Sequence, residues 1–173
     1  MDGTFRLGAG ANKVRAWELA AYATFKAVRP DLGCREGALA TLAAACREVC
    51  TTLLVQCAAR PAGRTGPALG VTADAIASAV ERLGAGRVAP SGVAPPKELL
   101  AAVALELTTG SPVDLAAAVA AAIAPLVEAA AELADERHSA KNILDGCIMK
   151  QDLTSARFSG AFSLLAELGG TAR

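Results

Sequence analysis

The stretch REGALATLAAACREVCTTLLVQCAAR, residues 35–60, decides the fold of this 173-residue chain. Its leucines, valines and cysteines recur at intervals of three and four residues from Leu39 to Cys57, which is the repeat of one face of an α-helix. Pro61 ends the pattern, because proline cannot continue a helix. The sequence therefore predicts a long central helix with a narrow seam of small residues, which a partner helix can approach closely.

The segments on either side carry the same kind of repeat, separated by glycine and proline. Asn12 and Thr72 are typical helix-capping residues. Ser111, Pro112 and Asp114 form a third helix start, with a cap, a first-turn proline and an early acid. Besides 35–60, the expected helices cover residues 12–29, 72–83, 96–107, 111–145 and, after a cap at Asp152 or Thr154, a last helix to Leu168.

The composition supports an all-α fold. The chain is alanine-rich, with 42 alanines but only six aromatic residues. Alanine is the strongest helix former and a poor strand former. We therefore predict a single compact bundle of five to six helices joined by short Gly/Pro loops. Residues 1–11 are expected to form a flexible N-terminal arm, and residues 12–173 a single helical-bundle domain.

Targeting signals and cysteine usage point to a reducing compartment. The chain has no uninterrupted run of about 18 apolar residues, so we predict no membrane span. Its first ten residues, MDGTFRLGAG, lack the basic cluster and apolar run of a secretory signal. An odd number of cysteines argues against a disulfide framework and favours free thiols, as in the cytoplasm. The five cysteines are Cys34, Cys46, Cys50, Cys57 and Cys147.

The only histidine, His138, lies in ADERHSAKNILDG, residues 134–146. A histidine followed three residues later by a lysine resembles histidine phosphotransfer domains, in which an exposed imidazole accepts a phosphoryl group. The resemblance implies that His138 is the phosphoacceptor and that Lys141 steadies the phosphoryl group. The chain departs from that family at Asn142, where glycine is usual. The alternative interpretation is an ordinary surface histidine in a solvated, charged turn.

Residues suited to catalysis or metal binding form no recognisable constellation in the sequence. A single histidine excludes multi-histidine zinc sites and weakens any histidine-based triad. Cys46 and Cys50, one helical turn apart, could ligate a soft metal, but burial in a core is the commoner use of such cysteines. The chain also lacks a phosphate-binding loop and a nucleophile elbow. We therefore predict that the protein is not an enzyme and holds no metal or cofactor.

The chain carries no net charge, but its charges are unevenly placed. Residues 1–64 hold nine basic and five acidic residues, a net charge of +4, whereas residues 65–173 hold eight basic and twelve acidic residues, a net charge of −4. Such an asymmetry either arises by chance or assists head-to-tail contacts between copies. A basic net charge is the strongest indication of nucleic-acid binding, and this chain lacks it. Nucleic-acid binding is therefore only a secondary interpretation. Its candidate phosphate contacts are Lys13, Arg15, Lys26 and Arg29.

The last predicted helix carries the densest aromatic pair of the chain. Phe158 and Phe162 are four residues apart on one side, and Leu165 and Leu168 extend the same stripe. A terminal amphipathic helix docks either on its own bundle or on a neighbouring copy with the same contacts. The sequence predicts these four residues as a partner-binding stripe and leaves both docking modes open.

The expected function is therefore a non-enzymatic protein-interaction or assembly protein that acts through apolar helix faces and self-associates. Its expected partner is another protein or a second copy of the chain. Two alternatives remain: a phosphotransfer-type signalling domain using His138, and an all-helical viral coat-like or decoy protein. The order of helices is similar to that of all-helical coat proteins of filamentous viruses, and the length is similar to that of helical viral decoys of the Bcl-2 type.

Overall fold

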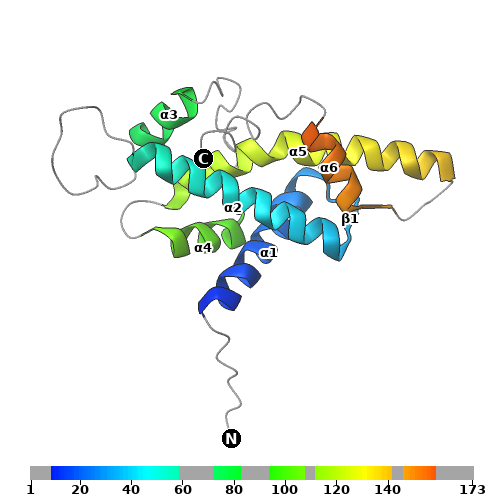
Figure 1. The fold of residues 1–173 in the computed structure, drawn as a ribbon, viewed down its shortest axis with the longest axis horizontal. Helices are drawn as coiled ribbons and strands as arrows, with labels where there is room; N and C mark the ends of the chain where they lie inside the picture. Colours follow the sequence, from blue (N-terminus) through cyan, green and yellow to red (C-terminus); the bar gives the residue numbers. More distant parts are fainter. Residues whose placement is uncertain (1–8, 59–71, 83–93, 108–111, 142–145, 159–173) are drawn as a thin grey trace, which may run out of the picture.

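The computed structural model describes residues 9–58, 72–82, 94–107, 112–141 and 146–158, and it confirms an all-α bundle (Figure 1). The described part contains six helices and two very short strands. In chain order these are α1 (Ala9–Val28), β1 (Gly33–Cys34), α2 (Glu36–Ala58), α3 (Ala73–Arg82), α4 (Lys97–Glu106), α5 (Pro112–Lys141), β2 (Cys147–Ile148) and α6 (Lys150–Phe158).

The first helix is longer than its capping signal indicates. It begins at Ala9, so the predicted arm over residues 1–11 is wrong at its C-terminal end. Alanine has a high helix propensity, and Ala9 and Ala11 extend the helix by a turn ahead of Asn12. Residues 1–8 lie outside the described part of the chain.

The central helix follows the prediction closely. α2 runs from Glu36 to Ala58, and most of its predicted seam is buried: Leu42, Cys46, Val49, Cys50 and Leu53. The predicted cap of α3 is also present, because the backbone N–H of Ala75 donates to Thr72 Oγ1 at 3.1 Å. Local sequence signals therefore place both helices correctly.

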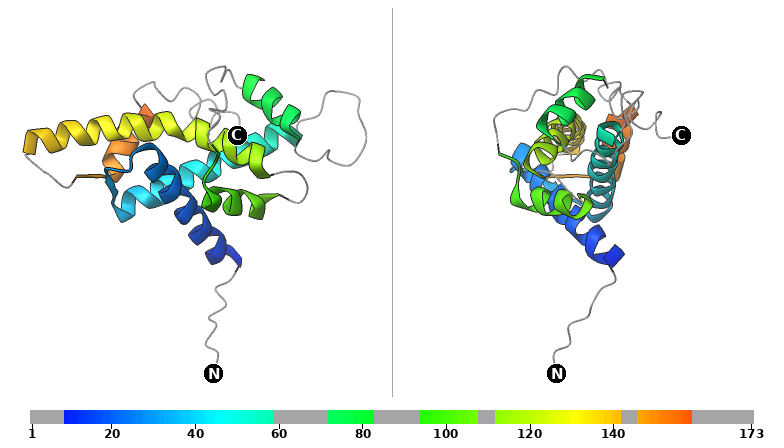
Figure 2. Two further views of the ribbon diagram at one scale, coloured as in Figure 1. Left: turned by 180° about the vertical axis from the view of Figure 1, so that it is seen from behind. Right: turned by 90° about the vertical axis from the view of Figure 1, so that its left-hand side faces the viewer.

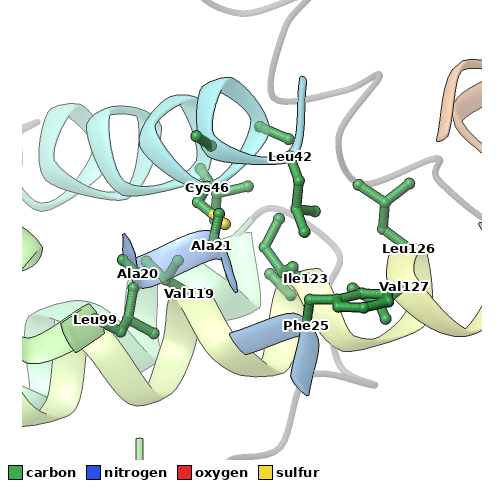
Figure 3. Packing of buried hydrophobic residues seen from close by; sticks show 14 of the residues in the cluster. Ala20, Ala21, Phe25, Leu42, Cys46, Leu99, Val119, Ile123, Leu126 and Val127 are labelled. Carbon is green, nitrogen blue, oxygen red and sulfur yellow. The ribbon is translucent and has the colours of Figure 1, made fainter. Parts of the chain in front are cut away.

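The core lies where α1, α2, α4 and α5 meet (Figure 3). α5 runs along the long axis of the molecule, and the other helices pack around it (Figures 1 and 2). Phe25 of α1, Leu42 of α2, Leu99 of α4 and Ile123 of α5 are fully buried there. Alanines such as Ala20 and Ala21 separate them, and such small side chains let helix axes approach toward the close end of the usual range of about 8–10 Å.

A two-residue parallel ladder joins segments far apart in the sequence. Gly33 pairs with Cys147 and Cys34 with Ile148, so the turn after α1 is tied to the start of α6. The sequence shows no alternating pattern that predicts a strand at either place. Two residues are too few to show the alternation by which a strand is recognised.

The last helix begins earlier than predicted. α6 starts at Lys150, so neither Asp152 nor Thr154 is its cap residue. Asp152 is the third helical residue, and its Oδ2 accepts the backbone N–H of Met149 at 2.7 Å, which is the acidic half of a capping box. The predicted continuation to Leu168 lies outside the described residues.

Two of the described helices are long and apolar enough to cross a bilayer. They are α2, over Glu36–Val55, and α5, over its whole length of Pro112–Lys141. Neither helix is an uninterrupted apolar run, because polar residues are scattered along both, so the sequence pattern did not indicate them as possible spans. Half of each is buried within the bundle, and the core helix of a bundle passes the same test, so the observation is weak evidence for a membrane.

Candidate functional site

An apolar recess of about 450 Å³ lies between α1 and α2, and we call it the α1–α2 recess. Its floor consists of small side chains that follow the helical repeat of α2, and Trp17 of α1 forms a wall. Alanine at these positions leaves space that longer side chains would fill. The lining residues are Val14, Trp17, Glu18, Ala40, Ala43, Ala44, Arg47, Glu48, Thr51 and Thr52.

Trp17 is held in place by a carboxylate from a third helix. Its indole Nε1 donates to Oε1 of Glu106, at the end of α4, over 3.4 Å. Lys13 Nζ and Arg47 Nε each lie 3.7 Å from the same oxygen. The Glu106 side chain is 17% exposed, so the two cations face it in a partly dry environment, where ion pairs are less screened than at the surface. These contacts link α1, α2 and α4 around the recess and fix the tryptophan ring.

Exposed apolar side chains continue the recess on both helices. Val14, Trp17, Ala21 and Phe25 follow one helical stripe of α1, a repeat that predicts a buried face. Val14 is instead 51% exposed and lines the recess. The stripe prediction is wrong at Val14 because none of the described helices covers that side of the first turns of α1. On α2, Val55 is 60% exposed, one helical turn after Thr51. The rim carries both charges, with Glu18, Arg47 and Glu48. An apolar floor within a charged rim is typical of a surface that receives another helix.

The predicted partner-binding stripe is described only at its beginning. Phe158 is the last residue of α6, and Phe162, Leu165 and Leu168 lie outside the described residues. Within α6, Asp152, Leu153 and Ala156 are buried against the bundle. The stripe as a whole therefore remains a prediction.

His138 is not in a solvated turn, so that interpretation is wrong. The residue is 8% exposed, because Gly146 and Cys147 lie against it. Its Nε2 accepts the backbone N–H of Cys147 at 3.3 Å, and Arg137 Nη2 lies 3.5 Å away. A Cβ at Gly146 would come within 2.2 Å of the imidazole, so the backbone crosses directly over the ring. A phosphoryl group on Nε2 would need this hydrogen bond to break, whereas Lys141 is exposed at the end of α5.

Sequence reasoning missed the buried ion pair beside this histidine. Arg137 Nη1 contacts Oδ1 of Asp152, and Arg137 Nη2 donates to the carbonyl oxygen of Cys147 at 2.9 Å. Asp152 is 5% exposed. The sequence indicated only that Asp152 lies near the start of the last helix, and its pairing with Arg137 depends on how α5 and α6 meet. This cluster fixes the α5–α6 corner, and both carboxylate oxygens of Asp152 already have hydrogen-bond partners.

None of the five cysteines, all within the described residues, forms a disulfide, and Cys46 and Cys50 are buried in the core. Burial raises the pKa of the Cys46 thiol to about 12. Burial, with the Glu106 carboxylate, raises the pKa of Cys50 to about 12 as well. Burial also raises the pKa of Cys34, to about 11. The described residues contain no group of three or more histidine, cysteine, aspartate or glutamate side chains that could hold a metal ion.

Three of the four candidate phosphate contacts already have partners. Lys13 pairs with Glu106, as described above. Lys26 Nζ donates to the carbonyl oxygens of Pro30 and Leu32, at 3.3 and 2.7 Å. Arg29 pairs with Asp31 and Asp135, at 2.8 and 3.1 Å. The four residues lie at opposite ends of α1 and form no common basic surface.

The α1–α2 recess therefore combines exposed apolar surface with a fixed aromatic side chain, which the cluster around His138 does not. Comparisons with protein-family models, with curated protein sequences and with solved structures find no match for this chain.

Proposed function

We propose that this protein is a non-enzymatic interaction or assembly protein that binds a second copy of itself through the α1–α2 recess. The observation that carries the proposal is the apolar recess of about 450 Å³ with Trp17 held against it by Glu106. Trp17 itself is only 1% exposed, so it supports the recess from beneath, and a partner would cover the exposed apolar side chains of Val14, Ala40 and Ala44. Because the hydrogen bond to Glu106 holds this support in place before binding, the recess loses little conformational entropy on association.

The floor of the recess suits a helix. Ala40, Ala43 and Ala44 follow the three-and-four spacing of one helix face, and small residues at that spacing allow an incoming helix to approach closely. An amphipathic helix in an apolar groove is a common mode of protein recognition. Glu18, Arg47 and Glu48 at the rim then select the orientation of the partner.

We also propose that the chain works without metal or cofactor in a reducing compartment such as the cytoplasm. The cysteines support a reducing compartment, because Cys46 and Cys50 lie in the core as protonated thiols outside any disulfide. Cys34 and Cys147 belong to neighbouring strands but are offset by one residue in the ladder. Their side chains therefore point to opposite faces, which does not favour a disulfide between them.

Self-association is tested by sedimentation velocity over a wide range of protein concentration, with Ala44→Arg as the recess variant. Ala44 is exposed on α2, so a long side chain fits without disturbing the core but occupies the recess. Ala101→Arg is the matched control, because Ala101 is an exposed helical alanine of α4 that does not line the recess.

We expect the unmodified chain and Ala101→Arg to form the same dimer, and Ala44→Arg to dissociate at least tenfold more readily. Far-UV circular dichroism should show equal helix content for all three proteins. A chain that stays monomeric at every concentration would contradict the proposal, as would a dimer that Ala44→Arg leaves unchanged.

A further inference from the structure

We propose that His138 is a pH switch: its neutral imidazole holds residues 146–148 against the bundle, and its protonation releases them. We call residues 146–148 the β2 segment, because they contain β2 and the glycine before it. The switch lies at the corner where α5, β2 and α6 meet, and it shares no residue with the α1–α2 recess.

Both groups that approach Nε2 of His138 are hydrogen-bond donors. The backbone nitrogen of Cys147 lies 3.3 Å from Nε2, and Nη2 of Arg137 lies 3.5 Å from it. A backbone N–H and an arginine guanidinium supply hydrogens but no acceptor. Nε2 must therefore act as an acceptor, which places the proton of the neutral ring on Nδ1. The closed corner is built for the imidazole and not for the imidazolium.

The ring has no room to turn away from these donors. His138 is 8% exposed, and a Cβ at Gly146 would lie only 2.2 Å from Nδ1, so the backbone lies directly against the imidazole. A protonated ring would direct its Nε2–H at the N–H of Cys147, and the hydrogen bond between them would be lost. A buried donor without an acceptor is costly. Movement of the β2 segment off the ring relieves this conflict.

The carboxylates at this corner do not replace the lost acceptor. Asp152 balances the charge of Arg137, but its Oδ1 contacts Arg137 and its Oδ2 accepts the backbone N–H of Met149. Asp135, almost one turn before His138 on α5, is paired with Arg29. The charged and titratable groups of the described elements that meet here are Asp135, Glu136, Arg137 and Lys141 of α5, Cys34 of β1, Arg35 and Glu36 at the start of α2, Cys147 of β2, and Lys150 and Asp152 of α6.

The β2 segment carries the contacts that join β1 to β2. The backbone N–H of Gly33 donates to the carbonyl oxygen of Gly146 at 3.0 Å, and that of Arg35 donates to the carbonyl oxygen of Ile148 at 3.2 Å. Cys147, between these two acceptors, donates to His138. So short a ladder belongs to the parts of a protein that open locally at low cost. Release of the β2 segment therefore frees the turn after α1 from the start of α6.

Proton linkage sets the size of the effect. In the released state the ring is accessible to water, and an accessible histidine has a pKa of about 6.5. Because the closed state holds the neutral ring, the ratio of released to closed molecules rises as the pH falls below about 6.5. This ratio should be about tenfold higher at pH 5.5 than at pH 7.5, and stability at the corner is lost in the same direction.

Hydrogen exchange of the full-length chain, followed by NMR, tests the switch through the amides of Gly33, Arg35 and Cys147. We expect their protection factors to be about tenfold lower at pH 5.5 than at pH 7.5. The protection factor of Val49, in the buried seam of α2, should stay the same. Protection factors are compared rather than rates, because the intrinsic exchange rate of every amide also depends on pH.

The unmodified chain assigns the effect by itself. His138 is the only histidine, and histidine is the only side chain that ordinarily changes charge between pH 5 and 8. His138→Gln is the matched variant, because the amide oxygen of glutamine can accept the N–H of Cys147 but does not titrate. We expect its three reporter amides to be equally protected at both pH values. Nitrogen NMR of the ring at pH 7.5 should find the His138 proton on Nδ1.

Four results would overturn the proposal. The first is unchanged protection of the three amides at pH 5.5 in the unmodified chain. The second is an equal loss of protection in His138→Gln, which would assign the effect to another group. The third is a ring proton on Nε2 at pH 7.5. The fourth is an equal loss at Val49, which would mean global unfolding. If His138→Gln does not fold, the pH dependence of the unmodified chain decides the question.

Discussion

Arg137 of α5 and Asp152 of α6 form an ion pair in the interior of the protein, where Asp152 is almost inaccessible to water. Each partner makes a second contact: Arg137 donates to the carbonyl oxygen of Cys147, and Asp152 accepts the backbone N–H of Met149. The two side chains therefore satisfy backbone groups at the very place where the chain turns from β2 into α6. The contacts at this corner therefore set the direction in which α6 runs from β2.

Removing the cation from this pair should destabilise the protein strongly. Arg137→Met leaves the Asp152 carboxylate buried without its partner, which typically costs about 3–5 kcal/mol of unfolding free energy. Chemical denaturation followed by far-UV circular dichroism measures the loss. Arg29→Met is the control, because the carboxylates paired with Arg29 are well exposed, and its effect should be much smaller. Equal losses for the two variants would show that the buried pair has no special role.

Gly146 and His138 should behave as a coupled pair. A methyl group at Gly146 would lie 2.2 Å from Nδ1 and Cε1 of His138, so Gly146→Ala must displace the ring or the backbone. We expect a loss of about 1–3 kcal/mol in unfolding free energy, as is usual for overpacking. In a His138→Ala background, the same substitution should cost clearly less, because the space is free. Additive effects in this double-mutant cycle would contradict the contact.

The Asp31 carboxylate should titrate unusually low. Hydrogen bonds from the Arg29 guanidinium lower the pKa of Asp31 from 3.8 to about 2. Because the pKa is lower in the folded state, this pairing contributes stability above about pH 4, and the contribution is lost as the pH falls toward 2. An NMR titration should give a midpoint near 2 for Asp31, and Arg29→Met should return it toward 3.8. An unchanged midpoint in that variant would assign the shift to another group.

Thiol labelling should divide the cysteines into two classes. Cys46 and Cys50 are buried, and their thiols have pKa values of about 12, so both accessibility and thiolate content are minimal at pH 8. Mass spectrometry after iodoacetamide treatment should find these two unmodified in the native protein and all five cysteines modified in denaturant. Rapid native labelling of Cys46 or Cys50 would mean that α2 opens locally.

The helices were predictable because their signals are local. The three-and-four repeat of α2, the Thr72 cap and the Pro112 start each depend on residues within a few turns, and the structure places these helices within a few residues of expectation. Val14 fits the apolar stripe of α1 just as well as Trp17 does. Whether such a residue is buried depends on how long the other helices are and where they cross. The repeat within one helix carries no information about either.

The candidate sites were much less predictable, because they join distant residues. The burial of His138 depends on Gly146 and Cys147 folding back over the end of α5. The position of Trp17 depends on Glu106, 89 residues further along the chain. The alanines of α2 indicated that another helix could come close, but the recess exists only because α1 crosses that face without covering it. Contacts between residues so far apart in the sequence produce no repeating pattern from which they could be predicted.

The short ladder between Gly33 and Cys147 has a consequence for how the protein is made. During synthesis, at roughly 5–20 residues per second, β1 emerges from the ribosome about 6 to 23 seconds before β2 exists to pair with it. Most of the helical bundle is synthesised in that interval, so the N-terminal helices have time to pack first. The ladder and the docking of α6 are therefore late events in folding, because the residues of β2 and α6 are synthesised after those of the other helices.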